Sequence, residues 1–131
     1  MHRRRIISIV FFCIYLAAVA YLCFAKPDKM PELPQLWFGL PADKVGHFLM
    51  FTPFPLLGLI AFEGDRMSVS SKIMLVGILV TLGIGTAAGT EKIQALLEYR
   101  TAEQSDLLAD NLGLCCGAAA ASIYILTRKK K

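Results

Sequence analysis

Hydrophobic residues in this chain fall into four continuous blocks separated by short polar segments, and they do not form a stripe along one helix face. The blocks cover approximately residues 6–25, 45–62, 73–89 and 107–127. A helix of about 20 residues rises about 30 Å, which is the thickness of a hydrocarbon core. The pattern therefore predicts an all-α membrane protein with four transmembrane helices in a single domain covering residues 1–131.

The first block has an alternative interpretation as a cleaved signal peptide. Cys23, Phe24 and Ala25 loosely resemble a cleavage site. The apolar core of the block is longer than the hydrophobic region of a typical signal peptide. We therefore expect the first block to be retained as a membrane span.

Prolines are expected to break regular helix at two places. Segment 26–43 contains four of them and is expected to be an irregular loop, with Trp37 and Phe38 lying against lipid headgroups. Inside the second block, Pro53 and Pro55 cannot donate helical hydrogen bonds, so we expect a kink there.

Residues 90–105 are more polar than the blocks on either side and predict a short interfacial helix or loop between the third and fourth spans. Thr101 and Gln104 have the spacing of a capping box, which would start the last helix near Ala102. Glycines four residues apart predict close helix contacts on two faces. These pairs are Gly85 with Gly89 and Gly113 with Gly117.

The composition supports a membrane location, since 56% of the residues are hydrophobic, 18% are charged and the mean hydropathy is +0.56. The net charge of +4 does not indicate nucleic-acid binding, because the basic residues flank the first and last apolar blocks and no nucleic-acid-binding motif is present. The four cysteines lie inside apolar blocks without C-x-x-C spacing, so we expect them to act as small packing residues.

Four spans place both termini on one side of the membrane. More Lys and Arg residues lie on that side, in the two termini and the 63–72 loop, than on the opposite side. Positive charge resists translocation, so both termini are expected in the cytoplasm of a multi-pass protein of the inner (cytoplasmic) membrane. The polar residues between the remaining span ends then face outward.

Those outward-facing span ends carry side chains that hydrocarbon disfavours, which marks them as candidate functional residues. His47 can be a general base, a nucleophile, a metal ligand or an interhelical hydrogen bonder. Carboxylates near the other span ends can orient it or neutralise a nearby cation. The candidate catalytic residues are His47, Glu91, Asp106 and Asp110.

Candidate substrate-binding residues accompany them on the same helix faces. Arg100 is suited to clamp phosphate or carboxylate, because its planar guanidinium donates to two oxygens at once; the alternative is that it pairs with Glu103 or reaches the headgroups. Asp106 also has the alternative role of stabilising a helix N-terminus. The candidate binding residues are Asp43, Lys44, Gln94 and Arg100.

We expect no cofactor and no metal. The alternative is a divalent cation held by the hard carboxylate oxygens of Glu91, Asp106 and Asp110. Zinc is disfavoured by the single histidine within the spans and by the absence of a cysteine cluster.

The order and spacing of these polar residues along the chain resemble the pattern of the VanZ-like family of small bacterial membrane proteins. The resemblance runs from about residue 43 to residue 117. The aromatic position often occupied by Tyr is Phe51 here, and Glu98 and Tyr99 stand where the family often has a proline before the arginine. The motifs that carry the resemblance are Asp43-Lys44-x-x-His47-Phe48, Glu91-x-x-Gln94, Arg100, Asp106, Asp110 and Gly113-x-x-x-Gly117.

The resemblance implies a role in the bacterial cell envelope, with a possible link to resistance against teicoplanin-type glycopeptide antibiotics. It also implies kinship with membrane enzymes that process lipid headgroups. The expected function is binding or turnover of a phosphate-bearing lipid, such as a carrier lipid or a phospholipid, by headgroup exchange or phosphoester hydrolysis. The competing hypothesis is a non-catalytic module that binds a lipid or a partner helix, and a third is that the polar groups only join the helices.

Overall fold

The computed structural model describes residues 2–24, 36–37, 40–97 and 104–129. Four helical stretches within them are long and apolar enough to cross a membrane: His2–Phe24, Lys44–Phe62, Val69–Leu96 and Asp106–Arg128. The predicted all-α class and the predicted number of spans are therefore confirmed. The elements, in chain order, are α1 (His2–Phe24), β1 (Leu36–Trp37), β2 (Leu40–Pro41), α2 (Ala42–Phe51), α3 (Pro53–Phe62), α4 (Val69–Leu96) and α5 (Gln104–Lys129).

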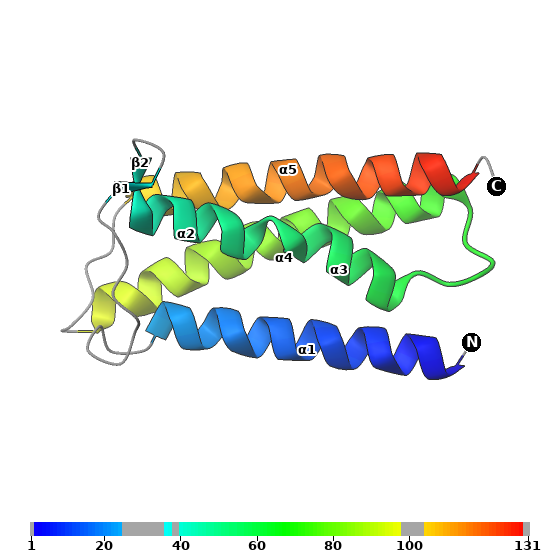
Figure 1. The fold of residues 1–131 in the computed structure, drawn as a ribbon, viewed down its shortest axis with the longest axis horizontal. Helices are drawn as coiled ribbons and strands as arrows, with labels where there is room; N and C mark the ends of the chain where they lie inside the picture. The colour runs from blue at the N-terminus through cyan, green and yellow to red at the C-terminus, as the bar shows by residue number, and fades with distance from the viewer. Residues whose placement is uncertain (1, 25–35, 38–39, 98–103, 130–131) are drawn as a thin grey trace.

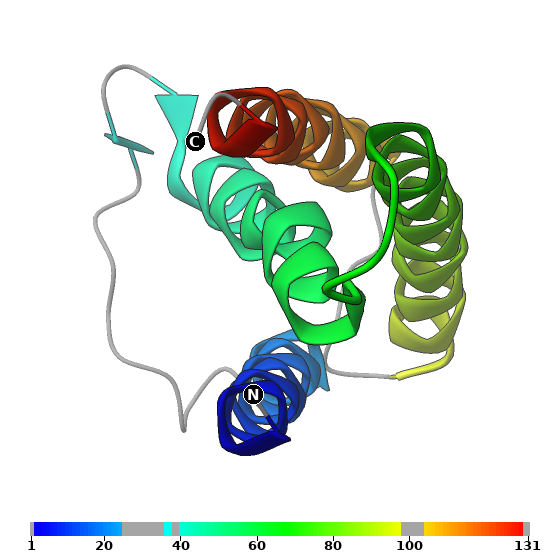
Figure 2. The ribbon, with the colours of Figure 1, turned by 90° about the vertical axis from the view of Figure 1, so that its right-hand side faces the viewer.

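The helices form an elongated bundle with both chain ends at the same end, drawn at the right of Figure 1. Helix α5 packs against α2, α3 and α4, whereas α1 packs mainly on α3 at the edge of the bundle. The end view in Figure 2 shows α3 between α1 and α5. Because the spans alternate in direction, α2 and α5 both begin at the end away from the termini (Figure 1).

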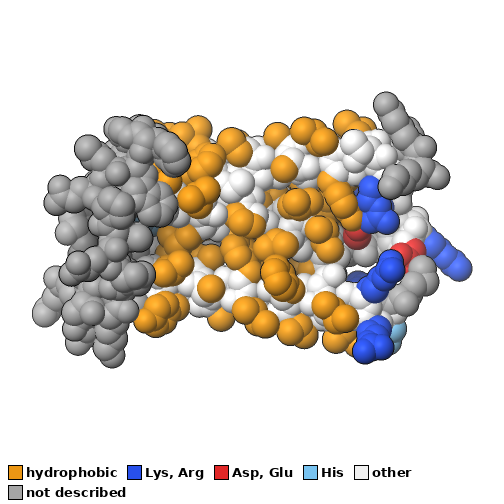
Figure 3. Space-filling model, viewed as in Figure 1, with side chains coloured by type: hydrophobic (Ala, Val, Ile, Leu, Met, Phe, Trp, Pro, Cys, Tyr) orange, Lys and Arg blue, Asp and Glu red, His pale blue; other side chains and the backbone are white. Residues whose placement is uncertain are grey.

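A belt of exposed apolar side chains covers the middle of the molecule (Figure 3). Met74 is 68% exposed, and Ile14 and Ile123 are each 62% exposed. So much exposed apolar area would be unfavourable in water, and it is the surface expected of helices that contact lipid. Charged side chains gather at the terminal end of the bundle in the same view.

The expected proline kink is confirmed. Helix α2 ends at Phe51 and α3 begins at Pro53, with Thr52 between them. The carbonyl oxygen of Phe48 accepts hydrogen bonds from the Thr52 backbone nitrogen at 3.1 Å and from the Thr52 hydroxyl at 2.6 Å. These bonds satisfy the carbonyl of Phe48 at the break. Water cannot hydrogen-bond it there, because the break lies inside an apolar span.

Helix α5 approaches this break closely through the predicted pair Gly113 and Gly117. A Cβ atom at Gly113 would overlap the carbonyl oxygen of Phe48, and one at Gly117 would overlap the carbonyl oxygen of Thr52. Only glycine permits two backbones to approach this closely. This contact confirms that pair and brings the first turns of α5 against α2.

The predicted close contact at Gly85 and Gly89 is wrong, because no described atom lies within 4 Å of a Cβ atom built at either residue. The close approach on α4 falls instead at Gly83, where a Cβ atom would meet the side chains of Leu114 and Phe54. Gly85 lies two residues further on, which turns it about 200° around the helix and out of the interface.

Helix α4 continues without a break to Leu96, so residues 90–96 do not form the separate interfacial helix that we expected. Their polarity has another cause: Thr90 and Gln94 are buried on the inner face of the same helix. Helix α5 begins at Gln104, two residues after the predicted start, and Thr101 and Ala102 lie outside the described residues.

The predicted headgroup contact involves Trp37 and Phe38, and Phe38 also lies outside the described residues. Trp37 is described through its backbone alone, paired with Leu40 between β1 and β2.

Between the residues that the structure describes, side-chain hydrogen bonds from Tyr15 and Gln94 join α1 to the rest of the bundle. The Tyr15 hydroxyl donates to the carbonyl oxygen of Met50, and the Gln94 side-chain nitrogen donates to the carbonyl oxygen of Cys23 at 2.7 Å. Cys23 is buried, as expected of a packing residue, whereas the other three cysteines are exposed on the helix surfaces and do not pack as predicted: Cys13, Cys115 and Cys116.

Candidate functional site

Ionisable side chains from three helices meet at the end of the bundle away from the termini. Lys44 and His47 lie three residues apart on one face of α2, and Asp106 and Asp110 lie four apart on one face of α5. Glu91 comes from the last turns of α4. Because the glycine contacts of α5 hold it against α2, these faces are opposed across a short distance.

His47 and Asp110 form the central pair of this cluster. The Nδ1 atom of His47 lies 2.8 Å from Oδ1 of Asp110, and the residues are 8% and 0% exposed. When Asp110 is ionised its carboxylate can only accept, so Nδ1 of His47 is then the donor of this hydrogen bond. In a neutral imidazole this arrangement leaves Nε2 with a free lone pair, which is the atom available for chemistry.

Asp106 lies between a lysine and the histidine. Its Oδ1 atom forms an ion pair with Nζ of Lys44, and its Oδ2 atom lies 3.8 Å from Nε2 of His47. The second distance is too long for a hydrogen bond. The Nε2 atom therefore faces a carboxylate without being blocked by it.

Glu91 brings a third carboxylate to the same place. One of its oxygens, one of Asp106 and a ring nitrogen of His47 all lie within 4.8 Å of one another. The Oε1 atom of Glu91 is buried and has no hydrogen-bond partner among the described residues, as is also true of Oδ2 of Asp110. Unpaired buried oxygens are costly, which indicates that a further donor or cation belongs at this position.

The side chains of His47, Glu91 and Asp106 could hold a divalent cation. The Nε2 atom of His47 and the Oδ2 atom of Asp106 are 3.8 Å apart, a separation that two ligands of one cation can have. Lys44 already occupies one oxygen of Asp106, which leaves Oδ2 as its ligand atom.

The remaining predicted residues are distributed differently. Gln94 is buried, and its side-chain nitrogen is bonded to α1, so it has a packing role, and its part in substrate binding stays a prediction. Asp43 lies in the first turn of α2, where only its backbone is described. Arg100 lies outside the described residues.

Sequence reasoning missed a second polar network at the terminal end of the bundle. Glu63, at the end of α3, lies 3.2 Å from Nζ of Lys72 and 3.5 Å from Nη1 of Arg128. The Tyr124 hydroxyl lies 3.3 Å from Oε1 of the same carboxylate. The sequence signal that could have revealed this network is Glu63, an acidic residue directly after the second apolar block, at the end of the bundle where the first and last spans carry Arg and Lys.

Comparison with known proteins gives a family match and a relative of similar sequence. The VanZ/LLP1 family model matches residues 11–126. An uncharacterized protein of Schizosaccharomyces pombe (strain 972 / ATCC 24843) is 30% identical over 130 residues, which cover 98% of this chain and 70% of that protein. No solved structure is significantly similar to the chain.

The relative is a yeast protein, so the similarity reaches beyond bacteria. The family match includes the positions of His47, Glu91, Asp106 and Asp110, and it spans all four candidate membrane helices in whole or in part. The chain belongs to the VanZ/LLP1 family.

Proposed function

We propose that the cluster around His47 binds the phosphate-bearing headgroup of a membrane lipid and catalyses its hydrolysis or exchange. The observation that carries the proposal is the buried His47–Asp110 pair, which leaves Nε2 of the histidine directed toward the carboxylates of Asp106 and Glu91. A carboxylate that orients an imidazole in this way is the arrangement that general bases and nucleophiles use.

Each remaining group has a role in this proposal. Lys44 and Arg100 hold the phosphate oxygens, since both carry permanent positive charge and Arg100 can donate to two oxygens. Asp106 fixes the position of Lys44, to which it is paired. Glu91 and Gln94 position a water or a headgroup hydroxyl, and Asp43 lies at the entrance of the second span.

The reaction is a displacement at phosphorus. As a base, His47 takes a proton from water or from an incoming alcohol at Nε2, the new oxygen–phosphorus bond forms, and the ester bond to the departing group breaks. The proton then passes to the leaving oxygen, so that the histidine is regenerated. As a nucleophile, Nε2 bonds to phosphorus first while the ester bond to the departing group breaks, and the departing oxygen takes a proton from water. The incoming water or alcohol then bonds to phosphorus, the nitrogen–phosphorus bond breaks, and the incoming oxygen loses its proton to solvent, so that the histidine is regenerated.

The distribution of basic residues supports an orientation in a cytoplasmic membrane. Both termini lie at one end of the bundle, where Arg3, Arg4 and Arg5 begin α1. Positive charge favours the cytoplasmic side, so the His47 cluster faces outward in the proposed orientation. In a bacterial envelope this side meets carrier lipids and phospholipids. The proposal does not include glycopeptide resistance, since no described residue bears on those drugs.

A second candidate function is a non-catalytic module that holds a lipid or a partner helix. The observation that favours it is the mutual pairing within the cluster, where Lys44 bonds Asp106 and His47 bonds Asp110. Interhelical polar pairs in membranes average about 0.6 kcal/mol each, so these bonds also contribute to helix association. Under this function a lipid binds but no product forms.

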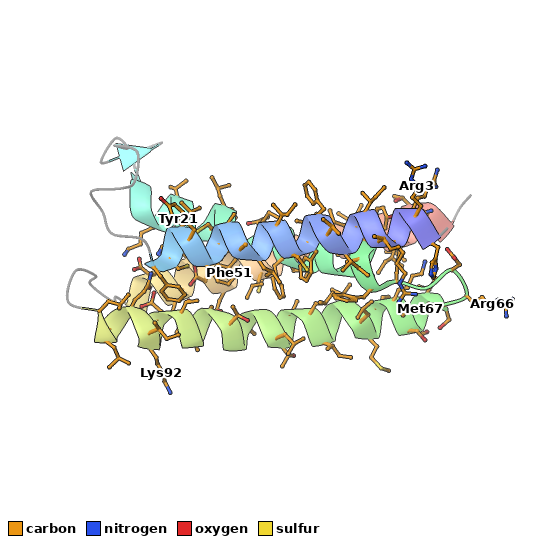
Figure 4. The ribbon with its side chains drawn as sticks, turned by 90° about the horizontal axis from the view of Figure 1, so that it is seen from below. Arg3, Tyr21, Phe51, Arg66, Met67 and Lys92 are labelled. Atoms are coloured by element: carbon orange, nitrogen blue, oxygen red, sulfur yellow. The ribbon has the colours of Figure 1, made fainter. Side chains whose placement is uncertain are left out.

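The distinguishing experiment uses full-length protein in liposomes that contain a phosphatidyl lipid or a polyprenyl phosphate ester, with products followed by mass spectrometry. His47→Gln should abolish product formation while leaving the protein folded. Lys92→Gln is the matched control, because Lys92 is exposed on α4 one residue from Glu91 and extends away from the bundle (Figure 4). Equal product from the wild type and His47→Gln would refute the catalytic role, and lipid binding without product would select the second function.

A further inference from the structure

A cavity of about 330 Å³ opens at the terminal end of the bundle, opposite the His47 cluster. It lies between the first turns of α1, the end of α3 and the last turns of α5. Figure 2 shows α3 between α1 and α5, and residues of all three helices line the cavity. The charged and polar residues that line it include Arg4, Arg5, Glu63, Asp65, Tyr124 and Arg128.

The lining is positively charged. Three guanidinium groups face two carboxylates, and one of these carboxylates, that of Glu63, is already matched by Lys72 at 3.2 Å and by Arg128 at 3.5 Å. Arg4 and Arg5 form no ion pair with any residue that the structure describes. The cavity therefore has an excess of positive charge that its own acids do not neutralise.

Arg128 is held in place at the cavity wall. Its Nη1 atom lies 2.5 Å from the Tyr124 hydroxyl, and its guanidinium carbon lies 5.3 Å from the centre of the same ring. An arginine stacked on an aromatic ring loses less side-chain freedom when it binds an anion. The wall opposite carries Arg4 and Arg5 on α1, so an anion in the cavity would be approached from two helices.

The depth of the cavity identifies the kind of anion. It lies where α1 begins and α5 ends, at the charged end of the molecule next to the belt of exposed apolar side chains (right of the belt in Figure 3). Ile60, part of the apolar span of α3, also lines it. A ligand that places a phosphate at this level and alkyl chains along the belt below is a phospholipid of the adjacent leaflet.

We propose that the cavity between Arg4, Arg5 and Arg128 is a binding site for the phosphate of an anionic phospholipid in the leaflet at the terminal end. The site is separate from the His47 cluster and does not depend on the function proposed for it. In the orientation proposed above, this leaflet is the cytoplasmic one, whose anionic lipids attract basic residues. Bound there, the lipid would join α1 to α5 across the open side of the bundle.

The test is native mass spectrometry of the full-length protein in detergent, titrated with phosphatidylglycerol and, separately, with zwitterionic phosphatidylcholine. Phosphatidylglycerol should bind at least about tenfold more tightly. Arg4→Gln with Arg5→Gln should reduce phosphatidylglycerol affinity by about tenfold or more, because two charged donors are lost. Since neither side chain pairs with a described residue, this double variant should fold normally.

The matched control is Arg3→Gln with Arg66→Gln, which removes the same charge at the same end. Neither residue lines the cavity, and Figure 4 shows Arg3 on the outside of α1 and Arg66 at the outer tip of the turn. Affinity within about twofold of the wild type is expected for this control. An equal loss in both double variants would show diffuse charge attraction and overturn the site.

Two further arms complete the test. Displacement of phosphatidylglycerol by excess inorganic phosphate would identify the free anion as the ligand and overturn the lipid assignment, whereas no displacement supports it. The loss caused by Arg4→Gln with Arg5→Gln should be of the same size in a His47→Gln background, because His47 lies at the other end of the bundle. If the two arginine changes have no effect in that background, the two sites are not separate.

Discussion

The Nδ1 atom of His47 lies 2.8 Å from the Oδ1 atom of Asp110, although the two residues are 63 positions apart in the chain. Both side chains are buried, and they come from the second and the last spans. The bond fixes the ring of His47 and determines which of its nitrogens is available.

Asp110→Asn should leave the fold nearly intact and reduce lipid turnover by about 10²-fold or more. The amide has almost the same shape as the carboxylate, but it can donate to the ring and reverse the tautomer, which would place the proton on Nε2. Turnover is measured in liposomes by mass spectrometry of the products. Unchanged turnover in folded Asp110→Asn would show that the pair is structural.

Lys44→Met should destabilise the protein by about 3–5 kcal/mol, because it leaves Asp106 as an unpaired buried charge. The side chains of Lys44 and Asp106 are 19% and 7% exposed, so water cannot replace the lost partner. The double variant Lys44→Met with Asp106→Leu should recover most of the loss. Unfolding in mixed micelles measures both, and equal stability of the single and double variants would contradict the pairing.

Gly117→Leu should destabilise the bundle by about 1–3 kcal/mol or more, because any Cβ atom at Gly117 overlaps the carbonyl oxygen of Thr52. Gly85→Leu is the control on the facing helix, where a Cβ atom built at Gly85 meets open space. It should be neutral or slightly stabilising. Thermal unfolding followed by circular dichroism compares the two, and similar effects at both glycines would refute the close approach at Gly117.

Gln94→Leu should loosen α1 from the bundle, with a loss of about 0.6–1.7 kcal/mol. The change removes the hydrogen bond that the Gln94 side chain donates to the Cys23 carbonyl. Hydrogen exchange in the last turns of α1 should rise relative to the wild type and to Lys92→Gln. If exchange rises equally throughout the chain, the bond stabilises the whole fold and not the docking of α1.

The proposed orientation predicts which side chains a membrane-impermeant thiol reagent reaches. In a variant without the native cysteines, Lys92→Cys should be labelled in intact cells, and Arg66→Cys should be labelled only after permeabilisation. Both residues are exposed. Lys92 lies near the end of α4, and Arg66 lies in the turn before α4 begins, at the opposite end of the bundle. The opposite labelling pattern would place the His47 cluster on the cytoplasmic side.

The structure corrects the sequence interpretation mainly at places where rotation about a helix axis matters. Gly85 and Gly83 are both small residues on α4, yet only Gly83 faces α5. For Gln94 the structure adds a partner, since its side-chain nitrogen is bonded to α1, while its part in substrate binding stays a prediction. Sequence spacing shows which residues share a face, but it does not show which neighbour that face meets.

The amino-acid sequence by itself determined the four spans, the break at Pro53 and the concentration of polar residues at span ends, since apolar length and proline geometry act locally along the chain. Only the tertiary structure decided that His47 meets Asp110, that Lys44 meets Asp106, and that α4 runs on to Leu96. Those outcomes depend on the relative rotation and depth of neighbouring helices. Packing at Gly113 and Gly117 sets that relation; the glycine spacing marks the contact face in the sequence but does not show which neighbouring helix it meets.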